Sequence, residues 1–153
     1  MPASNPRRRS ALPHALVMAL ALVTGVVPRT HAEEIHVVTH DTGGSVIARW
    51  HEVTSLRLEG TEVRIEGSCM SSCTMYLGLP NTCVSPSASF GFHGPRSGTT
   101  GQSLADTSAA RLMASHYPPA LRNWFLREGQ YLQGSHVVTL SGRQLIAMGI
   151  RRC

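Results

Sequence analysis

The sequence contains no lysine, so all 14 of its cationic side chains are arginines. Four of these arginines lie within the first 32 residues, and all nine acidic residues come after them. Residues 33–153 therefore hold ten arginines against nine acids, a formal net charge of about +1. Because nucleic-acid-binding domains are usually strongly basic, this balance argues against a nucleic-acid partner. The isoelectric point of 9.6 is largely a property of the N-terminal segment.

A hydrophobic run long enough to span a membrane is also missing near the N-terminus. The apolar run at residues 15–27 has about 13 residues, whereas a transmembrane helix needs about 20. This run follows Arg7-Arg8-Arg9 and precedes Thr30-His31-Ala32, which offers a small residue at a cleavage position. We therefore predict a signal peptide over residues 1–32 and a periplasmic or secreted mature protein. A retained membrane anchor is the alternative.

The sequence contains only four cysteines, all of them after residue 32: Cys69, Cys73, Cys83 and Cys153. In an exported protein an even number of cysteines predicts disulfides, here two. Three pairings are open. The alternative is a metal site at Cys69 and Cys73, but no Cys or His pair completes a zinc-finger pattern, so we expect no metal and no cofactor.

No internal repeat or low-complexity linker is present, so we expect one small domain over residues 33–153. Its class is α/β, because predicted strands alternate with predicted helices. The first helix, from residue 46, presents apolar residues that include Trp50, which we expect in the core. A capping box at Ser141 and Gln144 opens the last helix. The predicted strands cover residues 35–39, 63–65, 87–93 and 137–140, and the other predicted helices cover 70–79, 104–116 and 118–128.

Three short segments carry residues suited to chemistry. Gly43-Gly44-Ser45-Val46 follows a predicted strand and begins a helix. The segment from Gly67 to Cys73 forms a second strand-to-helix turn, and Gly91-Phe92-His93-Gly94-Pro95 ends a third strand. Glycine turns let backbone N–H groups approach a ligand, and helix N-termini favour negative charge. A serine in such a turn, with a histidine at a strand end, fits a nucleophile and its base.

These segments, their order and their spacing resemble the proteolytic subunit of Clp protease, within the Clp/crotonase superfamily. The likeness extends over about residues 35–153, and more narrowly to small exported Clp-like proteins of unassigned function. It implies a β-β-α spiral core with mostly parallel strands. It also implies that Ser71, four residues after Gly67, is the nucleophile and that His93 is the base. The N–H groups of Gly44 and Ser72 would then bind the oxyanion.

The sequence departs from this family at the third member of the triad. The family's aspartate precedes the closing helix, but no acid follows Glu128 here. Asp106 or Glu128 could substitute if the fold brings one of them to His93. Outside the cytoplasm no ATP is supplied, so we expect no ATP-driven unfoldase as a partner. The protein could still form a homo-oligomer.

The function expected from these residues is an exported serine hydrolase that acts on a peptide or an ester. The first alternative is a Clp-like binding or assembly module that has lost the triad acid and has no catalytic activity. An acyl-CoA enzyme of the crotonase branch is the second, weakened by the lack of a cation cluster for the CoA phosphates.

Overall fold

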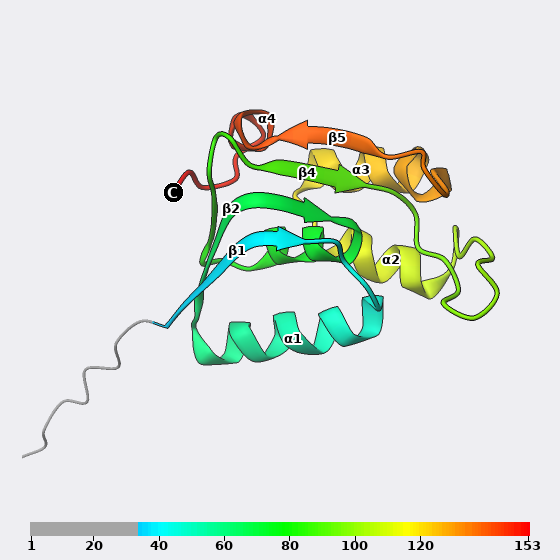
Figure 1. Cartoon of the computed structure of the whole chain (residues 1–153), viewed down its shortest axis with the longest axis horizontal. Coiled ribbons are helices and arrows are strands. Elements are labelled where there is room, and N and C mark those ends of the chain that lie inside the picture. Colours follow the sequence, from blue (N-terminus) through cyan, green and yellow to red (C-terminus); the bar gives the residue numbers. More distant parts are fainter. Residues whose placement is uncertain (1–33) are drawn as a thin grey trace, which may run out of the picture. The chain divides into compact units, whose positions relative to one another are not determined.

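A sheet of five strands lies at the centre of the computed structural model, which describes residues 34–153 (Figure 1). The predicted signal peptide therefore lies outside the described residues. The strand order is β1-β2-β4-β5, and the short β3 also pairs with β2. β2 runs parallel to β1, β3 and β4, and only the β4–β5 pair is antiparallel. The strands are β1 (Ile35–Asp41), β2 (Glu62–Met70), β3 (Thr82–Val84), β4 (Ser89–Phe92) and β5 (Val138–Ser141).

The helices connect these strands and confirm the α/β class: one small domain with a mixed, mostly parallel sheet and four α-helices. The predicted helix at residues 70–79 is a 3₁₀ helix, η1, and β3 was not predicted. The capping box at Ser141 and Gln144 is present as expected. The helical segments are α1 (Val46–Glu59), η1 (Ser71–Gly78), α2 (Ser108–Ser115), α3 (Pro119–Arg127), η2 (Gly129–Tyr131) and α4 (Gly142–Ala147).

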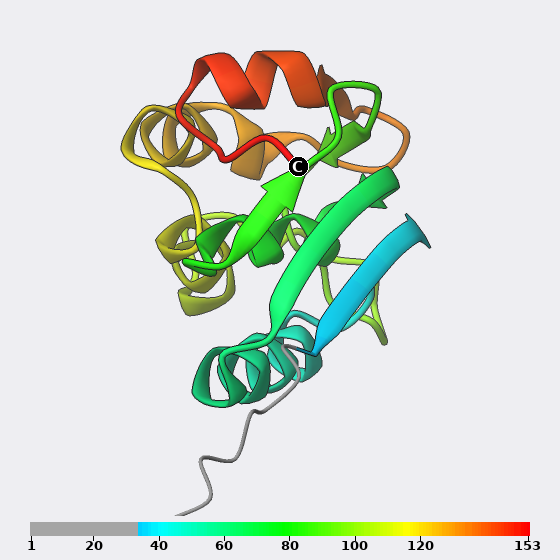
Figure 2. The same ribbon diagram turned by 90° about the vertical axis from the view of Figure 1, so that its left-hand side faces the viewer.

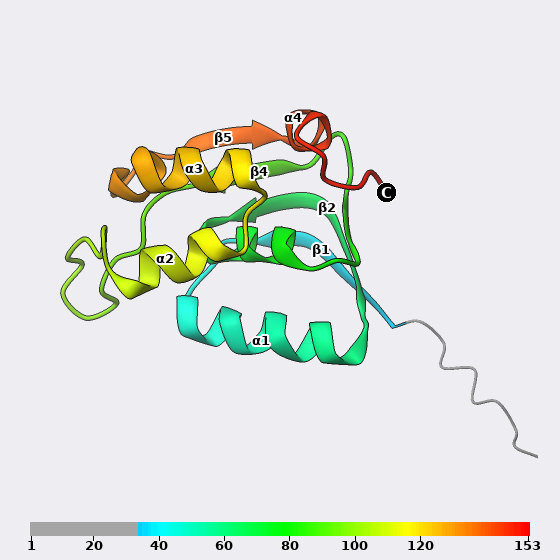
Figure 3. The same ribbon diagram turned by 180° about the vertical axis from the view of Figure 1, so that it is seen from behind.

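The hydrophobic core lies between the sheet and the helices on one of its sides. Figure 2 shows α2 and α3 on one side of the strands, and the view from behind in Figure 3 shows them in front of the sheet. Phe90 and Phe92 of β4 are buried there with Tyr117 and Phe125, and neighbouring rings meet edge to face. On β1, Val38 is buried whereas Val37 is exposed, as expected for a strand with one covered face.

Helix α1 packs only in part through the expected face: Val53 is buried and Val46 and Leu56 contact the core, but Trp50 is turned outward. Trp50 is 39% exposed, so its expected place in the core is wrong. Val53 is buried, and Arg49 takes the inward position one turn earlier, with a side chain only 10% exposed. Residues three to four apart share a helix face, so Arg49 and Val53 face inward together while Trp50 is rotated outward. Arg49 is held inward by charged partners, described below.

Candidate active site

Ser71 occupies the turn between β2 and η1 in an unusual backbone conformation. Its φ is +56°, and among residues 34–153 only Asp106 is another non-glycine residue with positive φ. Such a conformation costs about 1–3 kcal/mol and persists only where the surrounding structure imposes it. The nucleophile of α/β-hydrolases also lies on a sharp, strained strand-to-helix turn that exposes its hydroxyl. Ser71 shares with such a serine a strained backbone directly after a strand.

A disulfide encloses this turn. Cys69, near the end of β2, is bonded to Cys73 in η1, with Cα atoms 5.4 Å apart and both residues fully buried. The second disulfide joins Cys83 of β3 to the C-terminal Cys153, with Cα atoms 4.9 Å apart. The structure thus selects one of the three pairings, and it leaves no free cysteine among the described residues for the alternative metal site. Ser71 is the central residue of the small ring that the first disulfide closes.

The Gly43-Gly44 turn packs directly against Ser71. A Cβ atom on Gly43 would lie 2.7 Å from Ser71 Cβ and 2.7 Å from the Met70 carbonyl oxygen, and the φ of Gly43 is +90°. Only glycine fits this position, for both steric and conformational reasons. Gly44, with φ +142°, has open space beside it. Two of the three segments singled out in the sequence are therefore in contact.

The backbone N–H groups of Gly44 and Ser72 lie beside the Ser71 turn; Gly44 lines the pocket described below, whereas Ser72 is fully buried. Within residues 34–153 neither group donates a hydrogen bond to the protein, whereas the Gly43 N–H donates to Asp41 Oδ1 at 2.7 Å. Ser72 is the second residue of η1, and the first N–H groups of a helix have no partner inside it. These are the two groups that the family resemblance implies as oxyanion donors.

His93 follows β4 and is partly buried. Its Nδ1 lies 2.8 Å from the carbonyl oxygen of Gly94. Because a carbonyl oxygen only accepts hydrogen bonds, Nδ1 is the donor in this contact. In the neutral ring this contact favours the tautomer that leaves the lone pair on Nε2, as a general base requires.

The three segments line one pocket of about 630 Å³. Ser71 and His93 both border it, and no hydrogen bond joins the Ser71 hydroxyl to His93 in the described part of the chain. Hydrogen bonds of catalytic groups are often long before substrate binds and shorten in the complex. The lining residues are Thr42, Gly43, Gly44, Ser45, Val46, Ile47, Ser71, His93, Pro95, Arg96, Ser97, Gly98, Leu104 and Ala109.

Neither acid considered for the triad is bonded to His93. Asp106 accepts hydrogen bonds from the Tyr131 hydroxyl at 2.8 Å and from Gln130 Nε2 at 3.2 Å, and Glu128 is exposed near the end of α3. Among residues 34–153, no carboxylate is hydrogen-bonded to His93; the Gly94 carbonyl is its partner instead. A neutral carbonyl fixes the tautomer, but it stabilises an imidazolium less than a carboxylate does.

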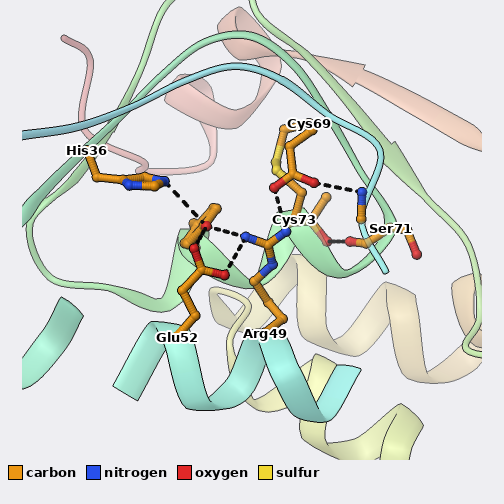
Figure 4. A network of polar contacts seen from close by, with 10 residues as sticks. His36, Arg49, Glu52, Cys69, Ser71 and Cys73 are labelled. Atoms are coloured by element: carbon orange, nitrogen blue, oxygen red, sulfur yellow. Dashed lines mark hydrogen bonds and ion pairs between the residues drawn. A yellow bond between two sulfur atoms is a disulfide. The ribbon is translucent and has the colours of Figure 1, made fainter. Parts of the chain in front are cut away.

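A network of charged and polar side chains, which the sequence did not reveal, lies behind the turn (Figure 4). Arg49 of α1 forms a salt bridge with Asp41 at the end of β1, and its guanidinium lies 4.5 Å from the centre of the Tyr76 ring in η1. Arg49 also donates to the Tyr76 hydroxyl, which in turn donates to Glu52 at 2.6 Å. Burial and the neighbouring Glu52 raise the pKa of Tyr76, so its phenol stays protonated.

This network joins the elements that present the two free N–H groups. Asp41 accepts from the Gly43 N–H and binds Arg49, so the β1–α1 turn is tied to helix α1. Tyr76 ties the same arginine to η1, which begins at Ser71. The sequence indicated this network only weakly. Arg49 and Glu52 are three residues apart on a helix, a spacing that is common on solvated helix surfaces.

The fold and the site together define a small α/β domain with a serine and a histidine at one pocket. The sequence matches no protein-family model, and a comparison with curated proteins finds no match. No helix within residues 34–153 is long and apolar enough to cross a membrane. In the same residues, no three His, Cys, Asp or Glu side chains gather closely enough to bind a metal ion.

Proposed function

We propose that this protein is an exported serine hydrolase, of peptidase or esterase type, with Ser71 as nucleophile and His93 as general base. The observation that carries the proposal is the positive φ of Ser71 in a strand-to-helix turn that borders the same pocket as His93. The free N–H groups beside that turn and the tautomer of His93 add support.

In the proposed reaction, Ser71 Oγ attacks a carbonyl carbon of the substrate while His93 Nε2 takes the hydroxyl proton. The new Oγ–C bond forms a tetrahedral oxyanion, which accepts hydrogen bonds from the N–H groups of Gly44 and Ser72. The bond from carbon to the leaving group then breaks, and Nε2 returns the proton to the leaving oxygen or nitrogen. Water next attacks the acyl-enzyme and gives its proton to Nε2. The Oγ–C bond then breaks to release the acid, and Nε2 gives this proton to Ser71 Oγ, which restores the hydroxyl.

The oxyanion donors would account for a large share of the rate enhancement. In a serine protease, loss of one such donor costs about 2.7–4 kcal/mol in the barrier. Since no carboxylate of residues 34–153 is hydrogen-bonded to His93, the imidazolium intermediate would be less stable than in a complete triad. We therefore expect turnover well below that of an enzyme with a complete triad.

We further propose that the domain has the Clp/crotonase-like β-β-α spiral. The parallel pairing of β1, β2 and β4 and the meeting of the three segments at one pocket support this assignment. The two disulfides support export, since such bonds persist in oxidising compartments. Without ATP in that compartment, the hydrolase would act without an unfoldase.

A binding module with no catalytic activity is the second candidate function. The observation that favours it is the absence, in residues 34–153, of a carboxylate bonded to His93. In such a module the pocket would hold a ligand without forming a covalent bond to Ser71.

A fluorophosphonate probe separates these two functions because it reacts only with an activated serine. The full chain is expressed with its own N-terminal segment, purified from the exported fraction and incubated with the probe. We expect labelling of the wild type, none in Ser71→Ala and strongly slowed labelling in His93→Gln. Ser55→Ala, on the exposed surface of α1, is the matched control and should label normally. An unlabelled wild type, or equal labelling of Ser71→Ala, would favour the binding module.

A further inference from the structure

Among the residues that line the pocket beside Ser71, one has a permanently charged side chain: Arg96, which is exposed to solvent. Apart from this arginine and His93, its lining residues carry no ionisable side chain, and no carboxylate is among them. Within the described part of the chain, the Arg96 guanidinium has neither a salt-bridge partner nor a hydrogen-bond acceptor. An unpaired cation at a pocket free of acids creates a local site for a negatively charged group.

The acids next to the lining segments in sequence are already engaged. Asp41, directly before Thr42, binds Arg49 and the Gly43 N–H. Asp106, two residues after Leu104, accepts from Tyr131 and Gln130. Neither carboxylate is bonded to Arg96, so its guanidinium is free to bind a ligand.

The backbone around Arg96 is held in place by hydrogen bonds. Arg96 forms an antiparallel bridge with Ser103. On either side of it, the Ser97 N–H donates to the Gln102 carbonyl at 2.8 Å and the Leu104 N–H donates to the Pro95 carbonyl at 2.9 Å. The cation is therefore carried by a defined loop, which begins directly after His93 and Gly94.

Part of the pocket lining is apolar. Val46 and Ile47 come from the first turn of α1, Leu104 precedes α2, and Ala109 lies in the first turn of α2. Ile47 is 54% exposed, although it is a large aliphatic side chain beside a pocket. An apolar group bound there would remove this surface from water, a favourable change.

We propose, on the basis of the hydrolase function above, that the substrate combines an apolar acyl portion with a free carboxylate that Arg96 binds. A guanidinium matches the planar geometry of a carboxylate through paired N–H donors. A single guanidinium neutralises the charge of a carboxylate fully but that of a phosphate dianion only in part, and the lining residues include no other permanently charged cation. A peptide with a free C-terminus and a half-ester of a dicarboxylic acid both carry this chemistry.

Two matched substrate pairs test the inference on the full chain. One pair is mono-4-nitrophenyl adipate and its neutral methyl ester; the other is N-acetyl-Ala-Leu with a free carboxylate and its C-terminal amide. In at least one pair we expect kcat/KM to be about tenfold to hundredfold higher for the charged member, the size of one charge-assisted hydrogen bond. The pair that shows the difference identifies the source of the carboxylate.

Arg96→Gln should abolish this preference while hydrolysis of the neutral member continues. Arg127→Gln, which alters an exposed arginine of α3 outside the pocket, is the matched control and should keep the preference. Equal kcat/KM for charged and neutral members in the wild type, or a preference that survives Arg96→Gln, would overturn the inference and leave the hydrolase intact.

A binding measurement decides the inference if no substrate is hydrolysed. Calorimetry on Ser71→Ala compares hexanoate with hexanamide, which differ in charge but hardly in size. If hexanoate binds more tightly than hexanamide, and this difference is lost in the double variant with Arg96→Gln, the carboxylate site is supported. This result would hold even if the proposed hydrolysis fails. Equal binding of the two compounds, or no binding of either, overturns it.

Discussion

Replacement of Gly43 by alanine should inactivate the site while the protein stays folded. The new Cβ would lie 2.7 Å from Ser71 Cβ, 2.7 Å from the Met70 carbonyl oxygen and 3.0 Å from the Ser72 nitrogen. None of these atoms is the end of a flexible side chain, so the β2–η1 turn must shift. The affected atoms belong to the proposed nucleophile and to one proposed oxyanion donor.

The expected magnitude has two parts. Alanine at φ +90° costs about 1–3 kcal/mol of backbone strain, and overpacking against the turn adds about 1–3 kcal/mol. The free energy of unfolding should therefore fall by about 2–6 kcal/mol. A displacement of about 1 Å at the reacting atoms is worth about 100-fold in rate, so labelling by the fluorophosphonate probe should slow by at least that factor.

Gly134→Ala is the matched control for this experiment. Gly134 has φ +63°, but a Cβ there would meet no atom within 4 Å. The control should lose about 1–3 kcal/mol of stability through strain alone and keep its labelling rate. Urea denaturation and the labelling time course of both variants provide the comparison. Normal labelling of Gly43→Ala, in protein that is still folded, would refute the assignment of this turn to the active site.

Two further predictions concern the disulfides and the pH dependence of stability. Removing the Cys83–Cys153 bond, which closes a separation of 70 residues, should lower the free energy of unfolding by about 4 kcal/mol. Removing the Cys69–Cys73 bond, with a separation of four, should lower it by only about 2 kcal/mol but should slow labelling of Ser71 more. Paired Cys→Ser variants are compared by thermal unfolding and by labelling, and the bond that matters more for stability should matter less for labelling. An equal effect of the two removals on labelling would contradict this prediction. Burial lowers the pKa of His116 from its usual 6.5, so the folded state disfavours the protonated ring. The stabilising contribution of neutral His116 is present above pH 6.5 and is lost as the pH falls through and below this value. Urea midpoints measured between pH 5 and 8 should fall on the acidic side in the wild type and change less in His116→Gln; identical pH profiles would exclude this residue as the cause.

Features that depend on neighbouring residues in the chain could be read from the sequence. The capping box at Ser141 and Gln144 needs only a helix start and a three-residue spacing, and it is present. The strand-to-helix turn was expected to begin at Gly67, but β2 continues to Met70, so only the change from strand to helix near Ser71 followed from the local pattern. The meeting of Gly43, Ser71 and His93 at one pocket was expected from the family resemblance, because their order along parallel strands brings the strand ends together.

Only the tertiary structure decided what depends on distant contacts. The cysteine pairing joins residues as far apart as Cys83 and Cys153, and no local pattern specifies it. Arg49 faces inward in place of Trp50 because Asp41, Glu52 and Tyr76 offset the cost of burying a charge. The partner of His93 is the carbonyl of the next residue, Gly94, and the distant Asp106 is bonded to Tyr131 instead, which only the tertiary structure shows. The sequence by itself thus determined which residues could do chemistry here, and the packing of distant segments decided which partners they have.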